Sequence, residues 1–359
     1  MANGDTLPSR VGQINSLGGS FDNDNALFLK KFAGEILTTF EENNIFKALH
    51  TVRTIENGKS AQFPVTGVAS ASYYTPGQSI ADADNSYLSD IKKNEKIITI
   101  DDVLLASTFL SSIDDVKNHY DIRSVYASEL GKALAIRFDT AIAKVFIGAA
   151  RETTPGVTGG KLGGILDVSA NAMGTGADSA DDADNSDVTG AELVAALFTA
   201  AQKLDENDVP SDGRFCVLRP SEYYKLITGA DGNNSFNLVS AVNKDIGGLG
   251  SIASGSIPQV AGISIYKSNH LPSTDLSGGA GIDAGGSNDV FGGNGVGYDG
   301  NFTNSLGIVA HPAAVGTVKL LDLATESEYQ IERQGTLFVA KYAMGHGVLR
   351  PECAIELQK

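Results

Sequence analysis

Hydrophobic residues that recur every three or four positions predict two long amphipathic helices. In residues 25–42 (NALFLKKFAGEILTTFEE) the apolar side chains fall on one helical face. In the stretch from Ser112 to Ala149 apolar residues step by four, at Ile122, Tyr126, Leu130, Leu134, Phe138, Ile142 and Phe146. A helix of roughly 30 residues would be on the order of 45 Å long, well beyond the usual length, so we expect it to form a spine.

Between these helices the period of the pattern changes, and strands are predicted. Thr51 to Glu56 and Lys59 to Val65 are strand-like and flank Asn57-Gly58, a common hairpin turn. Lys96 to Ile100 (KIITI) is a further strand. Residues 51–105 therefore predict a long two-stranded excursion with little core of its own, which needs a neighbour to pack against.

The second half of the chain mixes helices and strands without a regular βαβ repeat. Thr189 and Glu192 match a capping box, which predicts a helix that ends before Pro210. Its core-facing side chains would be Leu193, Ala196, Leu197, Ala200 and Leu204. Further predicted elements are strands at 214–218, 262–266 and 354–357, a short helix from Pro220 to Leu226, and alternating strands after residue 311. This mixture predicts the α+β class.

Charged residues are unevenly distributed along the chain. The 359 residues carry a net charge of −16, which argues against gripping phosphate backbones or anionic membranes over a broad face. Residues 167–187 hold six Asp, residues 273–300 hold four Asp and ten Gly, and neither stretch has a Lys or Arg. Together they supply −10 of the net charge, and both are expected to be exposed loops.

Compartment signals are few. Two cysteines, Cys216 and Cys353, cannot form a disulfide framework, so a reducing compartment is expected. The first residues show no signal-peptide pattern. The most apolar stretch, residues 133–150, is interrupted by Arg137, Asp139 and Lys144, so no membrane span is predicted.

Two glycine motifs resemble nucleotide-binding loops without their context. Gly58-Lys59-Ser60 looks like the end of a phosphate loop, but Arg53 occupies the place of the required first glycine, and the motif sits at a turn between strands. Gly295, Gly297 and Gly300 have dinucleotide-motif spacing, yet no strand precedes them and no helix follows. Neither motif predicts a nucleotide site.

A third glycine motif resembles a calcium-binding repeat. Residues 278–283 (GGAGID) match the start of a β-roll nonapeptide, with a poor second copy around Gly292. Such rolls share each ion between stacked turns, so a single copy favours a solvated loop over a calcium site.

Catalytic chemistry has no constellation of residues to support it. The five histidines show no metal-ligand spacing: His50, His119, His270, His311 and His346. His346 lies between Gly345 and Gly347, which suggests a tight backbone site. The charged run from Asp90 to Asp102 is typical of a solvated face or a subunit contact. We predict no catalytic residue, no cofactor, no metal and no enzyme activity.

Several long strings resemble one protein family. They are ALFLKKFAGEILTTF (26–40), GKSAQFPV (58–65), KIITIDD (96–102), NHYDIRSVYASELGKALA (118–135), AVGTVKLLDLATE (314–326) and AKYAMGHGVLRPE (340–352). In this order they closely resemble the major capsid proteins of short-tailed phages of the autographivirus type, which have the Hong Kong 97 capsid fold. The resemblance spans residues 25–359, apart from 151–187 and 273–300.

The resemblance implies a division of the chain. Residues 1–50 would be an N-terminal arm and residues 51–111 an extended loop that lies across a neighbouring subunit. Residues 112–188 would form the peripheral domain with its spine helix, and residues 307–359 its β-ribbon. Residues 189–306 would form an axial domain around fivefold and quasi-sixfold axes.

The same resemblance implies function by assembly. The chain would self-assemble into hexamers and pentamers of an icosahedral phage head that encloses double-stranded DNA. Its expected partners are a separate scaffolding protein, a portal protein at one vertex, and packaged DNA without sequence-specific contact. The first twenty residues are too short for a fused scaffold, and no Lys–Asn cross-link is matched. The expected location is the virion, after assembly in the bacterial cytoplasm.

Two other functions stay open at this point. An encapsulin-like compartment on the same fold would carry enzyme cargo in place of DNA. A calcium-dependent surface adhesin would use the Gly/Asp-rich stretch, and calcium titration followed by thermal melting would test it. For the capsid interpretation, acidic segments on the inner wall would repel DNA and let it slide.

Overall fold

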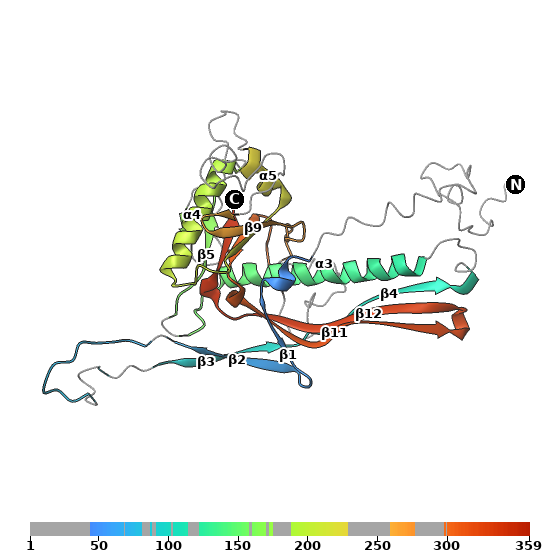
Figure 1. Cartoon of the computed structure of the whole chain (residues 1–359), viewed down its shortest axis with the longest axis horizontal. Helices are drawn as coiled ribbons and strands as arrows, with labels where there is room; N and C mark the ends of the chain where they lie inside the picture. Colours follow the sequence, from blue (N-terminus) through green and yellow to red (C-terminus); the bar gives the residue numbers. More distant parts are fainter. Residues whose placement is uncertain are drawn as a thin grey trace. The chain divides into compact units, whose positions relative to one another are not determined.

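The computed structural model describes residues 44–67, 69–80, 87, 91–101, 103–113, 122–157, 160–169, 172–174, 188–228, 259–276, 298 and 300–359. The expected helix in residues 25–42 lies outside them. The described elements are mixed helices and strands, so the α+β prediction is confirmed (Figure 1). The chain divides into two compact units. In the described residues one comprises 104–113, 122–135 and 323–341, and the other comprises the remainder.

A seven-stranded sheet, in the order β6-β5-β13-β10-β7-β9-β8, forms the core of the larger unit. Its strands are β5 (Gly164–Asp167), β6 (Ala172–Gly174), β7 (Phe215–Leu218), β8 (Gln259–Val260), β9 (Ile263–Lys267), β10 (Ser305–Ala310) and β13 (Ala354–Gln358). β7, β10 and β13 are buried along their whole length. The predicted strands at 214–218, 262–266 and 354–357 are confirmed as β7, β9 and β13.

One prediction for the acidic stretch 167–187 is wrong. Residues 172–174 form β6 and pair with β5, so this part is not a loop. The composition hid the strand because its three residues, Ala-Met-Gly, carry little hydrophobic pattern of their own. Residues 175–187 lie outside the described residues.

Two helices lie beside this sheet, α4 (Gly190–Glu206) and α5 (Pro220–Thr228). Thr189 caps α4 through the backbone amide of Glu192, and Glu192 returns the bond to the amide of Thr189, so the capping box is confirmed. The five predicted core-facing residues of α4 are all fully buried. α4 contacts α5, β5 and β8.

The predicted spine is confirmed as α3 (Ile122–Arg151), a single helix of 30 residues. Its second half, from residue 136, belongs to the larger unit, and residues 141–147, 149 and 150 are buried there. Phe146 packs there between Phe46 of the 3-10 turn η1 (Phe46–Ala48) and Phe215 of β7, at ring distances of 6.0 and 5.5 Å. Tyr126, predicted on the same stripe, is 39% exposed.

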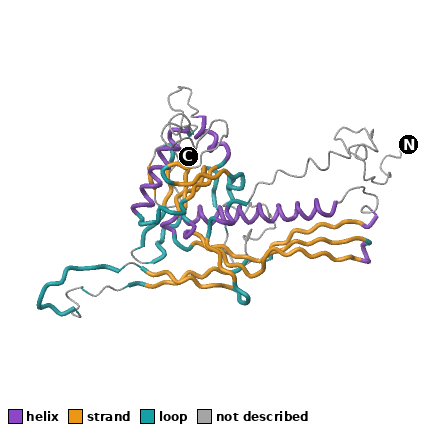
Figure 2. The backbone as a smooth tube through the Cα atoms, viewed as in Figure 1, coloured by secondary structure: helices purple, strands orange, loops and turns teal. Residues whose placement is uncertain are grey.

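A long hairpin is built from β11 (Val315–Gln330) and β12 (Gly335–Val348), joined by the 3-10 turn η3 (Ile331–Arg333). It forms a sheet in the order β1-β11-β12-β4, with β1 (Thr51–Thr54) parallel to β11 and β4 (Leu104–Ser111) at the other edge (Figure 2). The alternation predicted after residue 311 is confirmed. The strand β4 was not predicted.

The predicted hairpin around Asn57-Gly58 is wrong in its pairing. β1 and β2 (Ser60–Thr66) are both strands, and Gly58 makes a turn between them with φ 118°. β1, however, pairs with β11, and β2 pairs antiparallel with β3 (Lys93–Thr99) in a separate two-stranded sheet. Alternation shows that a segment is a strand but does not identify its partner.

Two short 3-10 turns complete the described fold, η2 (Pro312–Ala314) and η4 (Pro351–Cys353). Within the described ranges, no helix is long and apolar enough to cross a membrane.

Candidate functional site

The arm, defined here as β2, β3 and residues 67–92 between them, is the part of the larger unit with the least core of its own. At its root, Ala61 of β2, Ile98 of β3 and Ile100 just after β3 are buried against Val318, Ala343 and Leu349. Further out, the side-chain amide of Asn94 donates to the carbonyl of Gly156 at 2.8 Å. The amide of Gly67 donates to the carbonyl of Lys92 at 2.8 Å, which closes the two-stranded part.

Glycines allow this root to pack closely. A Cβ atom at Gly345 would overlap the carbonyl group of Thr99, and one at Gly347 would press on the side chain of Ile98. Only residues without a side chain let β12 approach β3 at this distance. The predicted tight backbone site around His346 is therefore confirmed. It lets β12 pack closely against β3 at the root of the arm.

His346 itself is a structural residue. It is buried, and its Nδ1 atom forms a 2.8 Å hydrogen bond with Oγ1 of the fully buried Thr317. Burial, with a smaller contribution from the nearby His50, lowers the pKa of His346 to about 3. The imidazole is therefore neutral at physiological pH.

Tyr298 joins the root to the end of the Gly/Asp-rich stretch. Its hydroxyl donates to Oδ2 of Asp101 at 2.8 Å and accepts from the backbone amide of His346 at 3.1 Å. Burial and the charge of Asp101 raise the pKa of the phenol, which stays protonated. The prediction that 273–300 is an exposed loop is therefore wrong for Tyr298 and also for Leu276, since both are buried. Residues 277–297 lie outside the described residues, including the calcium-like and dinucleotide-like glycines up to Gly297.

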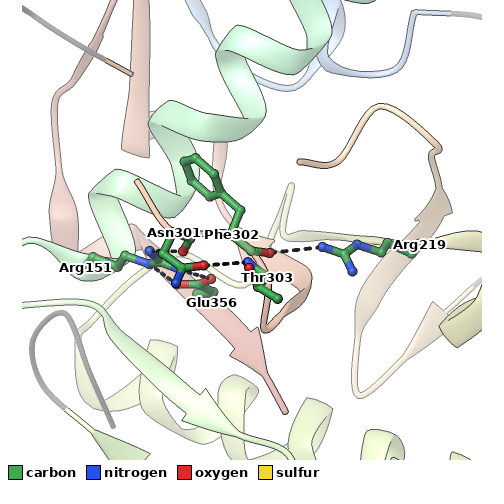
Figure 3. Close-up of polar contacts among 6 residues, drawn as sticks. All are labelled: Arg151, Arg219, Asn301, Phe302, Thr303 and Glu356. Atoms are coloured by element: carbon green, nitrogen blue, oxygen red, sulfur yellow. Dashed lines mark hydrogen bonds and ion pairs between the residues drawn. The ribbon is translucent and has the colours of Figure 1, made fainter. Parts of the chain in front are cut away.

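A buried ion pair ties the end of α3 to the sheet. Nε and Nη2 of Arg151 donate to the two carboxylate oxygens of Glu356 at 2.6 and 2.7 Å (Figure 3). Nη1 of Arg151 donates to the carbonyl of Asn301 at 2.6 Å, and the guanidinium lies 5.5 Å from the ring centre of Phe302. Glu356 is fully buried in β13, so the pair holds the helix against the centre of the core.

Arg219 holds the same segment from the other side. Its Nη2 atom donates to the carbonyls of Pro272 and Phe302, at 2.7 and 3.3 Å. Asp275 and Asn301 form an antiparallel bridge, and the amide of Leu276 donates to the carbonyl of Gly300. The two ends of the Gly/Asp-rich stretch are thus fastened together on the sheet.

Asp139 is a third buried anchor, in the middle of α3. Its Oδ2 atom accepts from the backbone amide of Ile45 at 3.2 Å and lies 3.1 Å from Nδ1 of His270. This carboxylate therefore holds the backbone at Ile45, just before η1, and the loop after β9. The pattern of apolar residues in the helix did not reveal it.

The remaining histidines do not gather into a metal or catalytic site among the described residues. His50 contacts the carbonyl of Phe46, and burial lowers its pKa. His311 caps η2, and burial also lowers its pKa. His119 lies outside the described residues. In the described part of the chain, no group of three or more His, Cys, Asp or Glu side chains could hold a metal ion.

Neither cysteine is placed for chemistry. Cys216 and Cys353 are free thiols and both are buried. Burial raises the pKa of Cys216, and burial with the neighbouring Glu352 raises the pKa of Cys353 to about 11. A thiol in this state is a poor nucleophile.

Half of the exposed large apolar side chains in the described residues lie on the arm or on and near β4. On the arm they are Tyr73, Tyr74, Ile80, Ile91 and Ile97, and on or near β4 they are Val103, Leu105, Phe109 and Ile113. Sequence reasoning treated 51–105 as one excursion and missed the strand β4 and its half-exposed face. The period-2 alternation of 104–111 was the signal that could have identified it. Such surfaces are suited to binding other protein surfaces.

Comparisons with known proteins agree on one family. The family model described as "Gp10A-like: Major capsid protein" matches residues 62–358. The chain is 36% identical over 339 residues to the major capsid protein of Escherichia phage T7, covering 92% of this chain and 90% of that protein. It is 33% identical over 361 residues to the major capsid protein of Enterobacteria phage T3, covering 96% and 95%. The capsid structure of cyanophage P-SCSP1u aligns with a TM-score of 0.73 and 39% identity over 99% of this chain and 98% of that one.

Proposed function

This chain belongs to the family of Gp10A-like major capsid proteins, and from that premise we propose how it builds a phage head. The resemblance to autographivirus capsid proteins and the Hong Kong 97-type fold are confirmed. The chain is a structural protein that assembles into the shell of a phage capsid and is a component of the virion. None of these comparisons supports the encapsulin-like compartment or the calcium-dependent adhesin.

The observation that supports this mechanism is the arm. Two strands with few neighbours are only marginally stable alone, and the arm as a whole leaves five large apolar side chains exposed, four of them between the strands. Its root, in contrast, is held by buried side chains and close backbone contacts. A firmly seated base and an uncovered end are what an arm needs in order to lie across a neighbouring subunit, and we assign it that role.

The domain division remains part of this proposal. Residues 1–50 would be the N-terminal arm, 51–111 the extended loop, 112–188 and 307–359 the peripheral domain, and 189–306 the axial domain. The seven-stranded sheet takes strands from 164–174 and 354–358 as well as from 215–310, so the proposed domains share one core. Hexamers and pentamers would form around the axial part, and many modest contacts would close the shell.

Three further partners belong to the proposal. A separate scaffolding protein would guide assembly in the bacterial cytoplasm, and a portal protein would occupy one vertex. Double-stranded DNA would fill the head without sequence-specific contact, and the acidic segments would keep it mobile if they face inward. The net charge of −16 supports the absence of a broad DNA-gripping face.

Electron microscopy of the expressed full chain tests the proposal. We expect closed icosahedral shells when a scaffolding protein is co-expressed, and irregular products or free subunits without it. Equally efficient formation of correct shells by the chain alone would contradict the need for a scaffold. No shells under either condition, from a folded protein, would contradict the assembly mechanism.

A variant with a shortened arm tests the role of the arm. Replacing residues 69–90 by a short Gly-Ser turn retains β2, β3 and the closing bond between Gly67 and Lys92. The variant should fold like the unchanged chain but should not form hexamers or shells. Normal shells from this variant would contradict the role given to the arm.

A further inference from the structure

The end of the arm has more internal order than a simple loop. Residues 75–78 (Thr-Pro-Gly-Gln) form a turn in which the amide of Gln78 donates to the carbonyl of Thr75 at 3.2 Å. Gly77 takes φ 96°, the left-handed region that glycine adopts freely. Proline and glycine at the two central positions are the residues that such a turn favours.

The side chains of Tyr74 and Tyr87, which lie before and after this turn in the chain, form hydrogen bonds with it. The hydroxyl of Tyr74 donates to the carbonyl of Gln78 at 2.9 Å, and the amide of Thr75 donates to the hydroxyl of Tyr87 at 3.1 Å. The hydroxyl of Tyr87 in turn donates to the side-chain oxygen of Gln78. The rings of Tyr74 and Tyr87 lie 5.6 Å apart. The tip is therefore held in one shape before any partner is bound.

Next to this braced turn stands Tyr73, which is fully exposed, at 102%. Every other exposed aromatic side chain in the described residues keeps part of its surface covered. A rigid aromatic side chain loses little conformational entropy when it is buried by a partner, and tyrosine is among the residues that dominate binding energy at interfaces. The Tyr73 side chain is uncovered in its own subunit, so its whole ring is available to a partner.

We propose that Tyr73 is the anchor by which the arm grips a second copy of this chain. The inference rests on the proposed function of the arm and adds which residue carries the contact. The network of Tyr74, Tyr87 and Gln78 serves to position that anchor. Because the shape is preorganised, more of the contact energy remains for assembly.

The structure also offers a surface on the second copy that fits. Gly335 of β12 lies beneath the ring of Phe109, so Phe109 and the odd-numbered residues of β12 share a face. An ion pair of 2.8 Å joins Lys341 to Glu326, which places Glu326 and, by alternation, Glu328 on that face. Leu105 and Phe109 are half-exposed there.

This outer face of the hairpin is thus apolar along β4 and acidic along β11. The arm is apolar at Tyr73, beside the turn, and at Ile91, and it is basic at Lys92 and Lys93, where its two-stranded part ends. The two surfaces are complementary in both respects, and charge complementarity favours the correct register of contact. We assign the outer face, residues 104–111, 323–330 and 335–341, as the receiving surface.

Substitution of Tyr73 tests the anchor in the full-length chain under the conditions in which the unchanged protein forms shells. Tyr73→Ala should raise the protein concentration needed for half-maximal assembly by about tenfold or more. Tyr73→Phe, which retains the ring, should stay within about threefold of the unchanged chain. Thermal melting of both unassembled variants should match the unchanged protein, because the Tyr73 side chain is fully exposed in its own subunit.

Two results would overturn the anchor. One is normal assembly by Tyr73→Ala, and the other is equal loss in the alanine and phenylalanine variants. If the arm-shortened variant fails to assemble while Tyr73→Ala assembles normally, the arm keeps its role and the anchor alone is wrong. If the arm-shortened variant assembles normally, the proposed function of the arm is wrong as well.

Photo-crosslinking tests the receiving surface. With p-benzoylphenylalanine in place of Tyr73, irradiated shells should yield a dimer cross-linked to peptides from 104–111, 323–330 or 335–341. Adducts to any other part of the chain would overturn the receiving surface, and adducts to a scaffolding protein alone would overturn the choice of partner. As a second measurement, Lys93→Glu should weaken assembly and Glu328→Lys in the same chain should restore it. Failure of that restoration would also count against the surface.

Discussion

The seven-stranded sheet and the arm are both β-structure, but they handle apolar residues in opposite ways. In the sheet, β7, β10 and β13 are buried along their length, and their one embedded charge, Glu356, is matched by Arg151. Among the described residues of the arm, the buried side chains lie at the root, and large apolar side chains further out face solvent. The sheet buries its apolar residues within one subunit, whereas we propose that the arm is completed by another subunit.

This contrast separates folding from assembly. Changes in the sheet should act through the free energy of unfolding, whereas changes at the outer arm should act on the concentration at which shells form. The root of the arm belongs to both, because Tyr298, His346 and the glycines of β12 connect it to the rest of the larger unit. Four substitutions test this division, ordered by their expected effect on folding.

Arg151→Ala should have the largest effect. It leaves the carboxylate of Glu356 buried without a partner, which typically costs about 3–5 kcal/mol. Chemical denaturation of the unassembled protein would measure the loss. The double variant Arg151→Ala with Glu356→Ala removes the unpaired charge and should recover part of the stability. An unchanged unfolding midpoint in the single variant would mean that the ion pair does not hold the core.

Gly345→Ala should come next, with a loss of about 3 kcal/mol, because the new Cβ atom overlaps the Thr99 carbonyl and β12 must move away from β3. The damage should concentrate at the root of the arm, which hydrogen exchange of β2 and β3 amides would detect. Gly148→Ala is the matched control, since a Cβ atom added there would meet nothing within 4 Å. In the last turn of α3 this change should leave stability within about 1 kcal/mol of the unchanged chain, with any change stabilising. Equal effects in the two variants would refute the close approach.

Lowering the pH should reduce the stability of the folded chain through protonation of His346 in the unfolded state. Its pKa is about 3 in the folded chain, against an ordinary 6.5, so only the unfolded state takes up a proton between these values. Stability from this group is complete above pH 6.5 and falls as the pH drops, by about 1.4 kcal/mol per pH unit. Between pH 7 and pH 5 the loss should be about 2 kcal/mol.

Thermal melting at pH 7 and pH 5 measures this loss, and His50 adds to it in the same direction because its pKa is also lowered. His346→Asn should be less stable at pH 7 but should show a smaller difference between the two pH values. A variant with the full pH dependence of the unchanged chain would exclude His346 as its source.

Ile97→Ser should have the smallest effect on folding, within about 0.5 kcal/mol, because its side chain is more than half exposed on β3. Shell formation should nevertheless weaken, as judged by sedimentation. Ile98→Ser is the control on the opposite face, where the side chain is buried, and it should destabilise by about 2–4 kcal/mol. If Ile97→Ser leaves both folding and assembly unchanged, this face of the arm is not an interface.

Much of the fold could be predicted from local pattern. The capping box at Thr189, the buried face of α4, the 30-residue spine and the strands β3, β7, β9 and β13 each depend on residues close together in the chain. The pairing of strands was harder to predict from the sequence. The Asn57-Gly58 turn suggested that β1 and β2 are partners, yet β1 pairs with residues 316–319, far along the chain. A local signal of this kind does not identify a partner strand so distant in the sequence.

The candidate site shows the same limit. The glycines around His346 predicted close packing, but the partner of Gly345, the Thr99 carbonyl, could not be known from the sequence. Composition predicted that 273–300 is exposed, and Tyr298 lies in that stretch. It is buried because Asp101 and His346 together offer its hydroxyl a donor and an acceptor. Tyr73 and Tyr74 were visible as an aromatic pair before Pro76-Gly77, but only the fold shows that one ring braces the turn and the other is uncovered.

The sequence by itself determined the family, the class of fold and the elements formed by short-range periodicity, because a helix or strand needs only the spacing of its own side chains. The tertiary structure decided which strands pair, which charges are buried together and which apolar side chains remain uncovered. These depend on contacts between residues distant in the chain, and their energies exist only once the backbone has brought the partners together. Tyr73 is the clearest case, since the sequence shows the residue type and only the fold shows that its side chain is uncovered.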